Sequence, residues 1–199
     1  MSLPLGLLVF LAALLGLGRL ARTRSTAVKL TRPVVVMLAL CAVPAIILAD
    51  QRGTPISLSV TLACAVVCAA SDLATGLVFD GVTATTAIAI LITSILSQDS
   101  LVAAIGASSC AGAMLLLYTV TRGRGIGLGD VKLGAVIGAG LGGVASVGAL
   151  GAAFIAGAVW AIPLLASSRA QRGDRVAFAP FLAVGAIACT ALRSVTGHG

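Results

Sequence analysis

The strongest constraint on this chain is a series of long segments without a charged residue. A helix that crosses a bilayer needs roughly 17–25 predominantly apolar residues. Six of the seven uncharged runs have about that length, and residues 133–168 are long enough for two spans with a turn at Gly142-Gly143. The seven runs cover residues 1–18, 33–49, 53–71, 81–98, 100–121, 133–168 and 176–192.

These runs predict an all-α fold, a polytopic membrane helix bundle. We expect about eight transmembrane segments, or seven if one half of residues 133–168 is re-entrant. Only 10% of the residues are charged and 59% are hydrophobic, whereas a soluble domain usually carries about 25% charged residues. The loops are short and no linker divides the chain, so we expect one domain over residues 1–199. Residues 1–54 would supply two of the segments, joined by a basic loop.

The basic residues predict the orientation of the bundle. The cluster from Arg19 to Arg32 follows the first apolar run, whereas the basic residues of a signal peptide precede it. The positive-inside rule places this loop in the cytoplasm and the N-terminus outside. Eight alternating spans then leave only Arg52 and Arg193, of thirteen basic residues, on the outer side with the C-terminus. We interpret the net charge of +7 as this orientation signal plus attraction to anionic lipid, and expect no nucleic-acid partner.

The sequence offers no convincing metal site or reactive thiol. Cys64 and Cys68 have ligand-like i,i+4 spacing, but no second Cys or His pair completes a zinc site. We expect the cysteines to pack between helices as small apolar side chains, and His198 to be a tail residue. All five cysteines lie in apolar runs: Cys41, Cys64, Cys68, Cys110 and Cys189.

A glycine repeat predicts a close contact between two helices. Gly134, Gly138 and Gly142 recur every four residues and therefore share one helix face. Small residues in this spacing let membrane helices approach closely. The segment after Asp130 is accordingly expected to be buried in the bundle.

All six acidic residues are aspartates, and two of them differ from the rest. Asp72 ends one apolar segment and Asp130 precedes another, which places both at cytoplasmic helix ends in the predicted topology. An ionisable residue at that depth is costly and is therefore a functional-site candidate, although Asp130 could instead cap a helix. The other four are expected to be turn, cap or surface residues: Asp50, Asp80, Asp99 and Asp174.

Two neighbouring carboxylates suit acid–base hydrolysis. They cannot both ionise easily, so one pKa rises and the pair shares a proton. The ionised member can take a proton from water while the protonated member polarises a peptide carbonyl. Gly125, Gly127 and Gly129 alternate just before Asp130. Glycine permits close approach of another chain, which would give room to an extended substrate, and a flexible loop is the alternative.

Three segments resemble motifs of the type IV prepilin peptidases. Gly127-Leu128-Gly129-Asp130-Val131-Lys132 is similar to the GxGD-Val-Lys signature of that family. Asp72-Leu73-Ala74-Thr75 resembles the family's first aspartate motif, and Phe178-Ala179-Pro180-Phe181-Leu182-Ala183 resembles a Pro-Phe-Gly-Pro-Phe-Leu-Ala segment of its last helix. The order and spacing also agree, and the resemblance covers roughly residues 55–190.

The resemblance implies a membrane aspartic endopeptidase of the bacterial inner membrane. Asp72 and Asp130 would be its catalytic residues, at the cytoplasmic side, and no cofactor or metal would be needed. The substrates would be prepilin or pseudopilin precursors, which carry a short basic leader before a hydrophobic helix. Lys132 is expected to hold a substrate or lipid anion. The residues expected to bind substrate or support the motifs are Thr75, Gly127, Gly129, Lys132 and Pro180.

The chain departs from the family pattern in three places. Val78-Phe79 stands where Ile-Pro is common, and Phe178-Ala179 replaces the usual Pro-Phe-Gly. Larger members carry a cysteine-paired cytosolic domain, linked to N-methylation, where this chain has only residues 19–32. We therefore expect peptidase activity without methyltransferase activity and no requirement for S-adenosylmethionine.

Three alternatives remain at this point. Membrane aspartates and glycine-interrupted helices also occur in transporters and channels. Presenilin-like and signal-peptide-peptidase-like proteases share GxGD but have Tyr before the first aspartate, where this chain has Ser71. A structural component whose aspartates have lost function is the third.

Overall fold

The computed structural model describes residues 56–123, 125–166 and 177–196, and the regular structure in these residues is entirely helical. Several expectations concern residues outside this part: the two segments and basic loop within residues 1–54, the loop around residues 169–175, both termini, and Asp50, Asp174, Cys41 and His198. The described helices are α3 (Ile56–Thr75), α4 (Asp80–Leu96), α5 (Ser100–Val120), α6 (Leu128–Leu141), α7 (Gly143–Ala166) and α8 (Ala179–Thr196).

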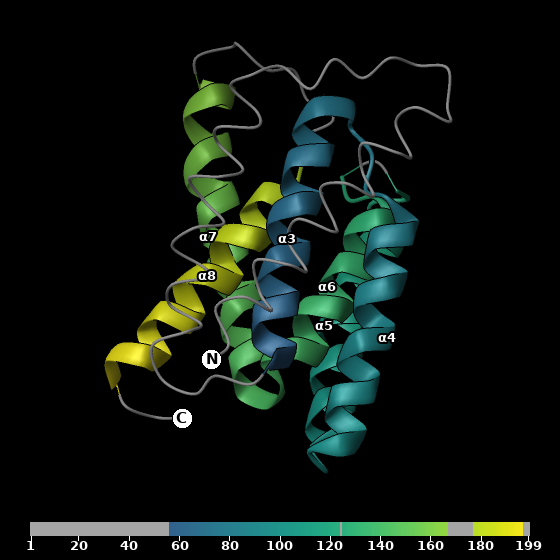
Figure 1. Ribbon diagram of the computed structural model, residues 1–199. Helices are drawn as coiled ribbons and strands as arrows, with labels where there is room; N and C mark the ends of the chain where they lie inside the picture. Colours follow the sequence, from purple (N-terminus) through teal and green to yellow (C-terminus); the bar gives the residue numbers. More distant parts are fainter. Residues whose placement is uncertain (1–55, 124, 167–176, 197–199) are drawn as a thin grey trace.

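Helix α3 lies at the centre of the bundle. It packs against α4, α6 and α8, and Figure 1 shows it between α7 and α8 on one side and α4 to α6 on the other. Every residue from Thr61 to Asp72 is buried. A helix that is apolar on all faces is suited to the interior, and the small side chains of this stretch, such as Ala65 and Cys68, leave room for neighbours on every side.

Helices α5 and α6 approach backbone to backbone through glycine. A Cβ built on Gly138 would collide with the Gly106 carbonyl, and one on Gly106 would collide with the Gly138 carbonyl. Gly134 faces Met114 and Gly142 faces Val102, so the whole predicted glycine face of α6 meets α5. The close packing expected from the repeat is confirmed.

The predicted turn at Gly142-Gly143 is also confirmed, because α6 ends at Leu141 and α7 begins at Gly143. Gly142 has a φ of 67°, a left-handed conformation that glycine adopts without the steric cost of a side chain. Helix α6 has 14 residues and rises about 21 Å. This is shorter than the roughly 30 Å of a bilayer core, so α6 alone does not make a complete span.

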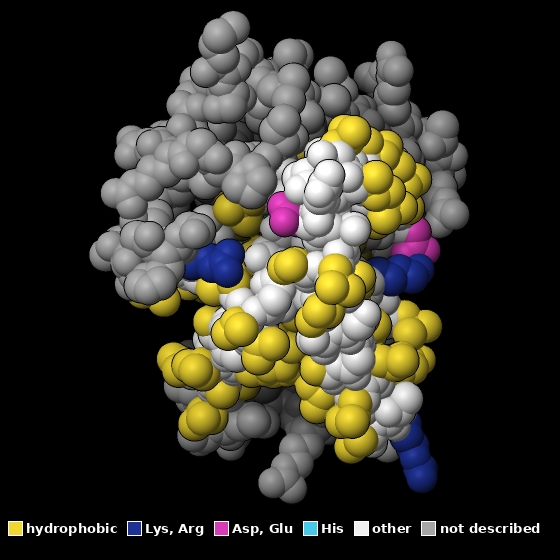
Figure 2. Space-filling view, turned by 90° about the horizontal axis from the view of Figure 1, so that it is seen from below, with side chains coloured by type: hydrophobic (Ala, Val, Ile, Leu, Met, Phe, Trp, Pro, Cys, Tyr) yellow, Lys and Arg dark blue, Asp and Glu magenta, His cyan; other side chains and the backbone are white. Residues whose placement is uncertain are grey.

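The outer helices carry the apolar surface that a bilayer would cover. Ser100–Val120 and Gly143–Ile162 are long and apolar enough to cross a membrane. Large hydrophobic side chains are exposed along α4, α5 and α7, including Leu96, Leu101 and Ile155. Figure 2, which looks at the bundle from below, shows further patches of hydrophobic side chains on that face. Soluble proteins rarely expose such extended apolar surface. These features indicate a membrane-embedded protein, while the number of spans stays a prediction.

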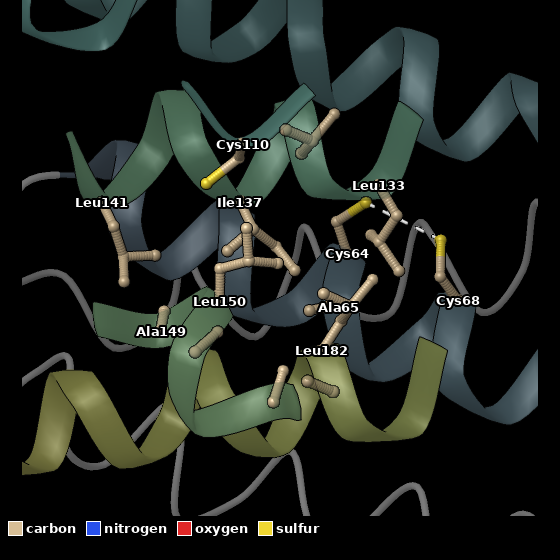
Figure 3. Packing of buried hydrophobic residues seen from close by; sticks show 14 of the residues in the cluster. Cys64, Ala65, Cys68, Cys110, Leu133, Ile137, Leu141, Ala149, Leu150 and Leu182 are labelled. Atoms are coloured by element: carbon tan, nitrogen blue, oxygen red, sulfur yellow. Dashed lines mark hydrogen bonds between the residues drawn. The ribbon is translucent and has the colours of Figure 1, made fainter. Parts of the chain in front are cut away.

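The cysteines in the described part of the chain lie in or against the buried apolar core. Cys64, Cys68 and Cys110 are buried free thiols, and they pack with Leu133, Ile137 and other apolar side chains in one core (Figure 3). The Cys64 and Cys68 sulfurs are 3.9 Å apart. Their role as small packing residues, expected from the sequence, is confirmed.

Candidate active site

Helices α3 and α6 run antiparallel, which brings Asp72 and Asp130 to the same end of the bundle. Gly140, near the end of α6, packs against Thr61 near the start of α3. At the other end, Gly129 packs against Val78, which follows α3. Asp72 is in the last turn of α3 and Asp130 is in the first turn of α6.

Asp72 is held by a helix that lies more than 100 residues further along the chain. Its side chain is buried, with 9% of the residue exposed. Oδ2 accepts a hydrogen bond of 3.2 Å from the backbone N–H of Ala179, the first residue of α8. This N–H is one of those that a helix leaves without an internal partner at its N-terminus.

Asp130 is held by its own helix. Gly127 precedes α6, and its backbone N–H donates a 3.0 Å hydrogen bond to Asp130 Oδ2. Gly127, not Asp130, therefore occupies the N-cap position that the sequence allowed for Asp130. Asp130 lies at the third helical position, and its carboxylate accepts the N–H of that N-cap residue. Its other oxygen, Oδ1, is buried and has no hydrogen-bond partner among the described residues.

Burial governs the protonation of Asp130. This residue lies in the first turn of α6, outside the two spans, and desolvation by burial raises its pKa to about 6. The Gly127 N–H acts in the opposite direction, and the negative charge of Asp72 raises the pKa further. The two carboxylates are thus close enough to influence each other, and such a pair titrates together.

The loop between α3 and α4 contacts Gly129, the glycine directly before Asp130. A Cβ on Gly129 would lie 2.9 Å from Val78 Cβ, so only glycine fits there without movement. Gly127 is extended, with a φ of −87° and a ψ of 158°, and a Cβ there would contact Asp130 Oδ2 at an ordinary 3.5 Å. The two glycines expected to support the motif therefore have different neighbours: Gly129 lies against Val78, and Gly127 lies against Asp130.

Lys132 and Asp80 form an ion pair beside this site. Lys132 Nζ lies 2.7 Å from Asp80 Oδ1, and both side chains are exposed. Asp80 is the first residue of α4, and the N-cap position is occupied by Phe79. The partner of Lys132 in this structure is therefore a carboxylate of the same chain, and its expected contact with a substrate or lipid anion stays a prediction.

The other predicted residues lie at the same end of the bundle. Thr75 is the last residue of α3, and Pro180 is the second residue of α8, next to Ala179. No group of three or more His, Cys, Asp or Glu residues in the described part of the chain could hold a metal ion.

The main contact that sequence reasoning missed is the Ala179 N–H. Ala179 belongs to the third family-like segment, so the segment was identified but this donor was not. A backbone donor has no signature in residue type, and only the position of α8 beside α3 reveals its acceptor.

Comparison with known families supports the resemblance carried by the segments around Asp72 and Asp130. Residues 59–162, just over half of the 199-residue chain, match the type IV leader peptidase family. Comparisons with curated protein sequences and with solved structures found no match. The matched region includes Asp72 and Asp130 and ends before α8. This chain is therefore a member of the type IV leader peptidase family.

Proposed function

We propose that this protein is a membrane-embedded aspartic endopeptidase that removes the leader from type IV prepilin-like precursors, with Asp72 and Asp130 as its catalytic residues. Family membership supports the peptidase activity over a transporter or a scaffold. One observation carries the choice of residues: antiparallel α3 and α6 each bury one aspartate at the same end of the bundle.

The environments of the two carboxylates support different roles for them. Burial raises the pKa of Asp72, but its carboxylate receives an N–H from the N-terminus of α8, and both this hydrogen bond and the helix dipole favour a negative charge. Asp130 Oδ1 is buried without a partner, and an unpaired buried charge is costly. A proton on Oδ1 removes that charge. In our proposal Asp72 is therefore the general base and Asp130 the general acid.

The reaction is a simple hydrolysis. Ionised Asp72 takes a proton from water, and the resulting hydroxide attacks the carbonyl carbon of the scissile peptide. Protonated Asp130 donates its proton to the carbonyl oxygen, giving a neutral tetrahedral gem-diol. The C–N bond then breaks as the amide nitrogen receives the proton held by Asp72 and Asp130 recovers a proton from the gem-diol. The products are a carboxylic acid and an amine, and neither a metal nor a covalent intermediate takes part.

Side chains around the aspartates suit a substrate with a hydrophobic helix. Leu73, Leu77 and Leu128 flank the two carboxylates in sequence and are between 47% and 62% exposed. An apolar segment of a precursor could cover them while its scissile bond lies at the carboxylates. This supports a substrate whose cleavage site adjoins a membrane helix.

The same end of the bundle is proposed to face the cytoplasm of a bacterial inner membrane. Arg122 and Lys132 lie in or near the loop that joins α5 to α6, at this end. Arg193 lies at the opposite end, where it donates a hydrogen bond of 3.3 Å to the Leu141 carbonyl. Among the described residues, basic side chains are thus more numerous near the aspartates than at the opposite end, which supports this orientation under the positive-inside rule.

The first experiment is cleavage of a co-expressed prepilin, measured as a gel shift. Asp72→Asn and Asp130→Asn preserve side-chain size but remove acid–base function, so each should abolish detectable processing. Asp99→Asn is the matched control, because Asp99 precedes α5 at the other end of the bundle. Membrane insertion of every variant is checked by fractionation. Cleavage by either the Asp72 or the Asp130 variant at the wild-type rate would refute the pair, and loss in the Asp99 variant would show that the assay reports folding.

A further inference from the structure

The first turn of α8 makes a contact with the proposed site that the family match does not include. Ala179 begins α8, has no exposed surface, and donates its backbone N–H to Asp72 Oδ2 at 3.2 Å. The matched residues end at 162, whereas α8 begins at 179. An element outside the match therefore holds one of the two carboxylates.

Aromatic packing holds this turn in place. The Phe178 ring packs against Phe154 of α7 with the ring centroids 5.2 Å apart, and Phe181 packs against Trp160 at 5.7 Å. Phe178 and Phe181 also contact each other, at 6.0 Å. Ring contacts by the residues before and after Ala179 therefore hold in place the turn that carries its N–H.

The residues next to Ala179 also explain why its N–H is the one that reaches Asp72. Pro180 occupies the second helical position of α8, where a missing N–H breaks no intrahelical bond. The backbone N–H groups of Phe181 and Leu182 both bond to the Phe178 carbonyl, which closes the first turn. Of the first three positions of the helix, only Ala179 has an N–H that is directed at a side chain of another helix.

We propose that the first turn of α8 is a positioning element for Asp72, with the Ala179 N–H setting the orientation of the carboxylate and favouring its ionised form. The inference rests on the proposed function, because it assumes that Asp72 is the general base. Ala179 acts through Asp72 and is a positioning residue. A fixed N–H costs no reorganisation during the reaction, which is why such a donor is useful beside a catalytic charge.

The decisive variants remove this N–H and little else. Ala179→Pro does so at the first helical position, where proline is well tolerated. Ala179→Gly keeps the N–H and serves as the matched control. Because a proline ring adds bulk at a buried position, the second variant replaces Ala179 by lactic acid through nonsense suppression. The resulting ester has the side chain of alanine but no N–H.

The expected result is a change in turnover and pH dependence at unchanged substrate affinity. Without the N–H, the ester variant should lose at least about tenfold in kcat, with KM within about threefold of wild type. Its acidic limb of kcat/KM should move to higher pH by at least about 0.5 unit, because a hydrogen bond to a carboxylate favours the charged form. The proline variant should behave alike, and the glycine variant should keep the wild-type pH profile.

Two results would distinguish failure of the inference about α8 from failure of the proposed function. If the ester variant has wild-type kcat and pH dependence, or if only its KM changes, α8 does not position Asp72 and the inference is overturned while the peptidase assignment stands. If Asp72→Asn, measured in the same assay, cleaves as wild type does, the proposed function itself has failed.

Discussion

Lys132 Nζ lies 2.7 Å from Asp80 Oδ1, so an ion pair connects the start of α4 to the start of α6. Asp80 follows the loop after Asp72, and Lys132 is two residues after Asp130. The pair therefore links the helix that carries Asp130 to the start of α4, which the short loop after α3 connects to the helix of Asp72.

Reversing the charges of this pair tests what Lys132 does. The single changes Asp80→Lys and Lys132→Asp should each slow cleavage by up to about fivefold, since an ion pair between exposed groups contributes about 0.2–1 kcal/mol. The double variant should recover most of the rate, because the attraction is restored with its ends exchanged. Initial cleavage rates of purified enzyme at low salt measure this. No recovery in the double variant, with Lys132→Asp severely impaired, would instead indicate that Lys132 contacts substrate.

Gly129→Ala should impair cleavage by at least about tenfold, since a displacement of about 1 Å at a catalytic site has effects of that size or larger. The new Cβ would lie 2.9 Å from Val78 Cβ and would push the loop after α3 away from Asp130. Gly125→Ala is the control, because its Cβ meets Thr121 Cγ2 at 3.5 Å, an ordinary contact.

The same contact allows a rescue. Val78→Gly removes the opposing Cβ, so the double variant Gly129→Ala/Val78→Gly should be more active than Gly129→Ala alone. If the double variant is no better, flexibility at position 129 matters more than its contact with Val78.

Gly138→Ala should lower the free energy of unfolding by about 1–3 kcal/mol, a usual cost of overpacking. The added methyl would collide with the Gly106 carbonyl, which is rigid backbone of α5. Gly112→Ala, on α5 itself, adds a methyl with nothing within 4 Å and should be close to neutral. Thermal unfolding in one detergent compares the two. Equal stability of both variants would contradict the backbone contact between α5 and α6.

Cleavage should slow as pH rises above about 6, because the pKa of Asp130 is raised to about 6 and its proton is lost above that value. In the proposed mechanism the deprotonated form cannot donate to the carbonyl oxygen. The kcat/KM profile between about pH 5 and pH 8 measures this limb as an apparent value of the pair. A rate that is constant over this range would show that Asp130 is not the acid that must be protonated.

Much of the site was predictable from amino-acid order because its signals are local. Uncharged runs predicted helices, glycines four residues apart predicted the α5–α6 contact, and two aspartates at the ends of apolar segments predicted the pair. Charge, size and spacing along one segment do not depend on where other segments lie. The family-like motifs around Asp72 and Asp130 added the chemistry, and the family match supports it.

Other features depend on which segments become neighbours, and only the tertiary structure decided them. Ala179 and Asp72 are 107 residues apart, and Lys132 and Asp80 are 52 apart. No local pattern connects such pairs, because each arises when helices pack side by side and a free donor or charge meets a partner. The burial of Asp130 Oδ1 without a hydrogen bond has the same origin. Desolvation is a property of the surrounding helices, and it is their packing that gives this aspartate its raised pKa.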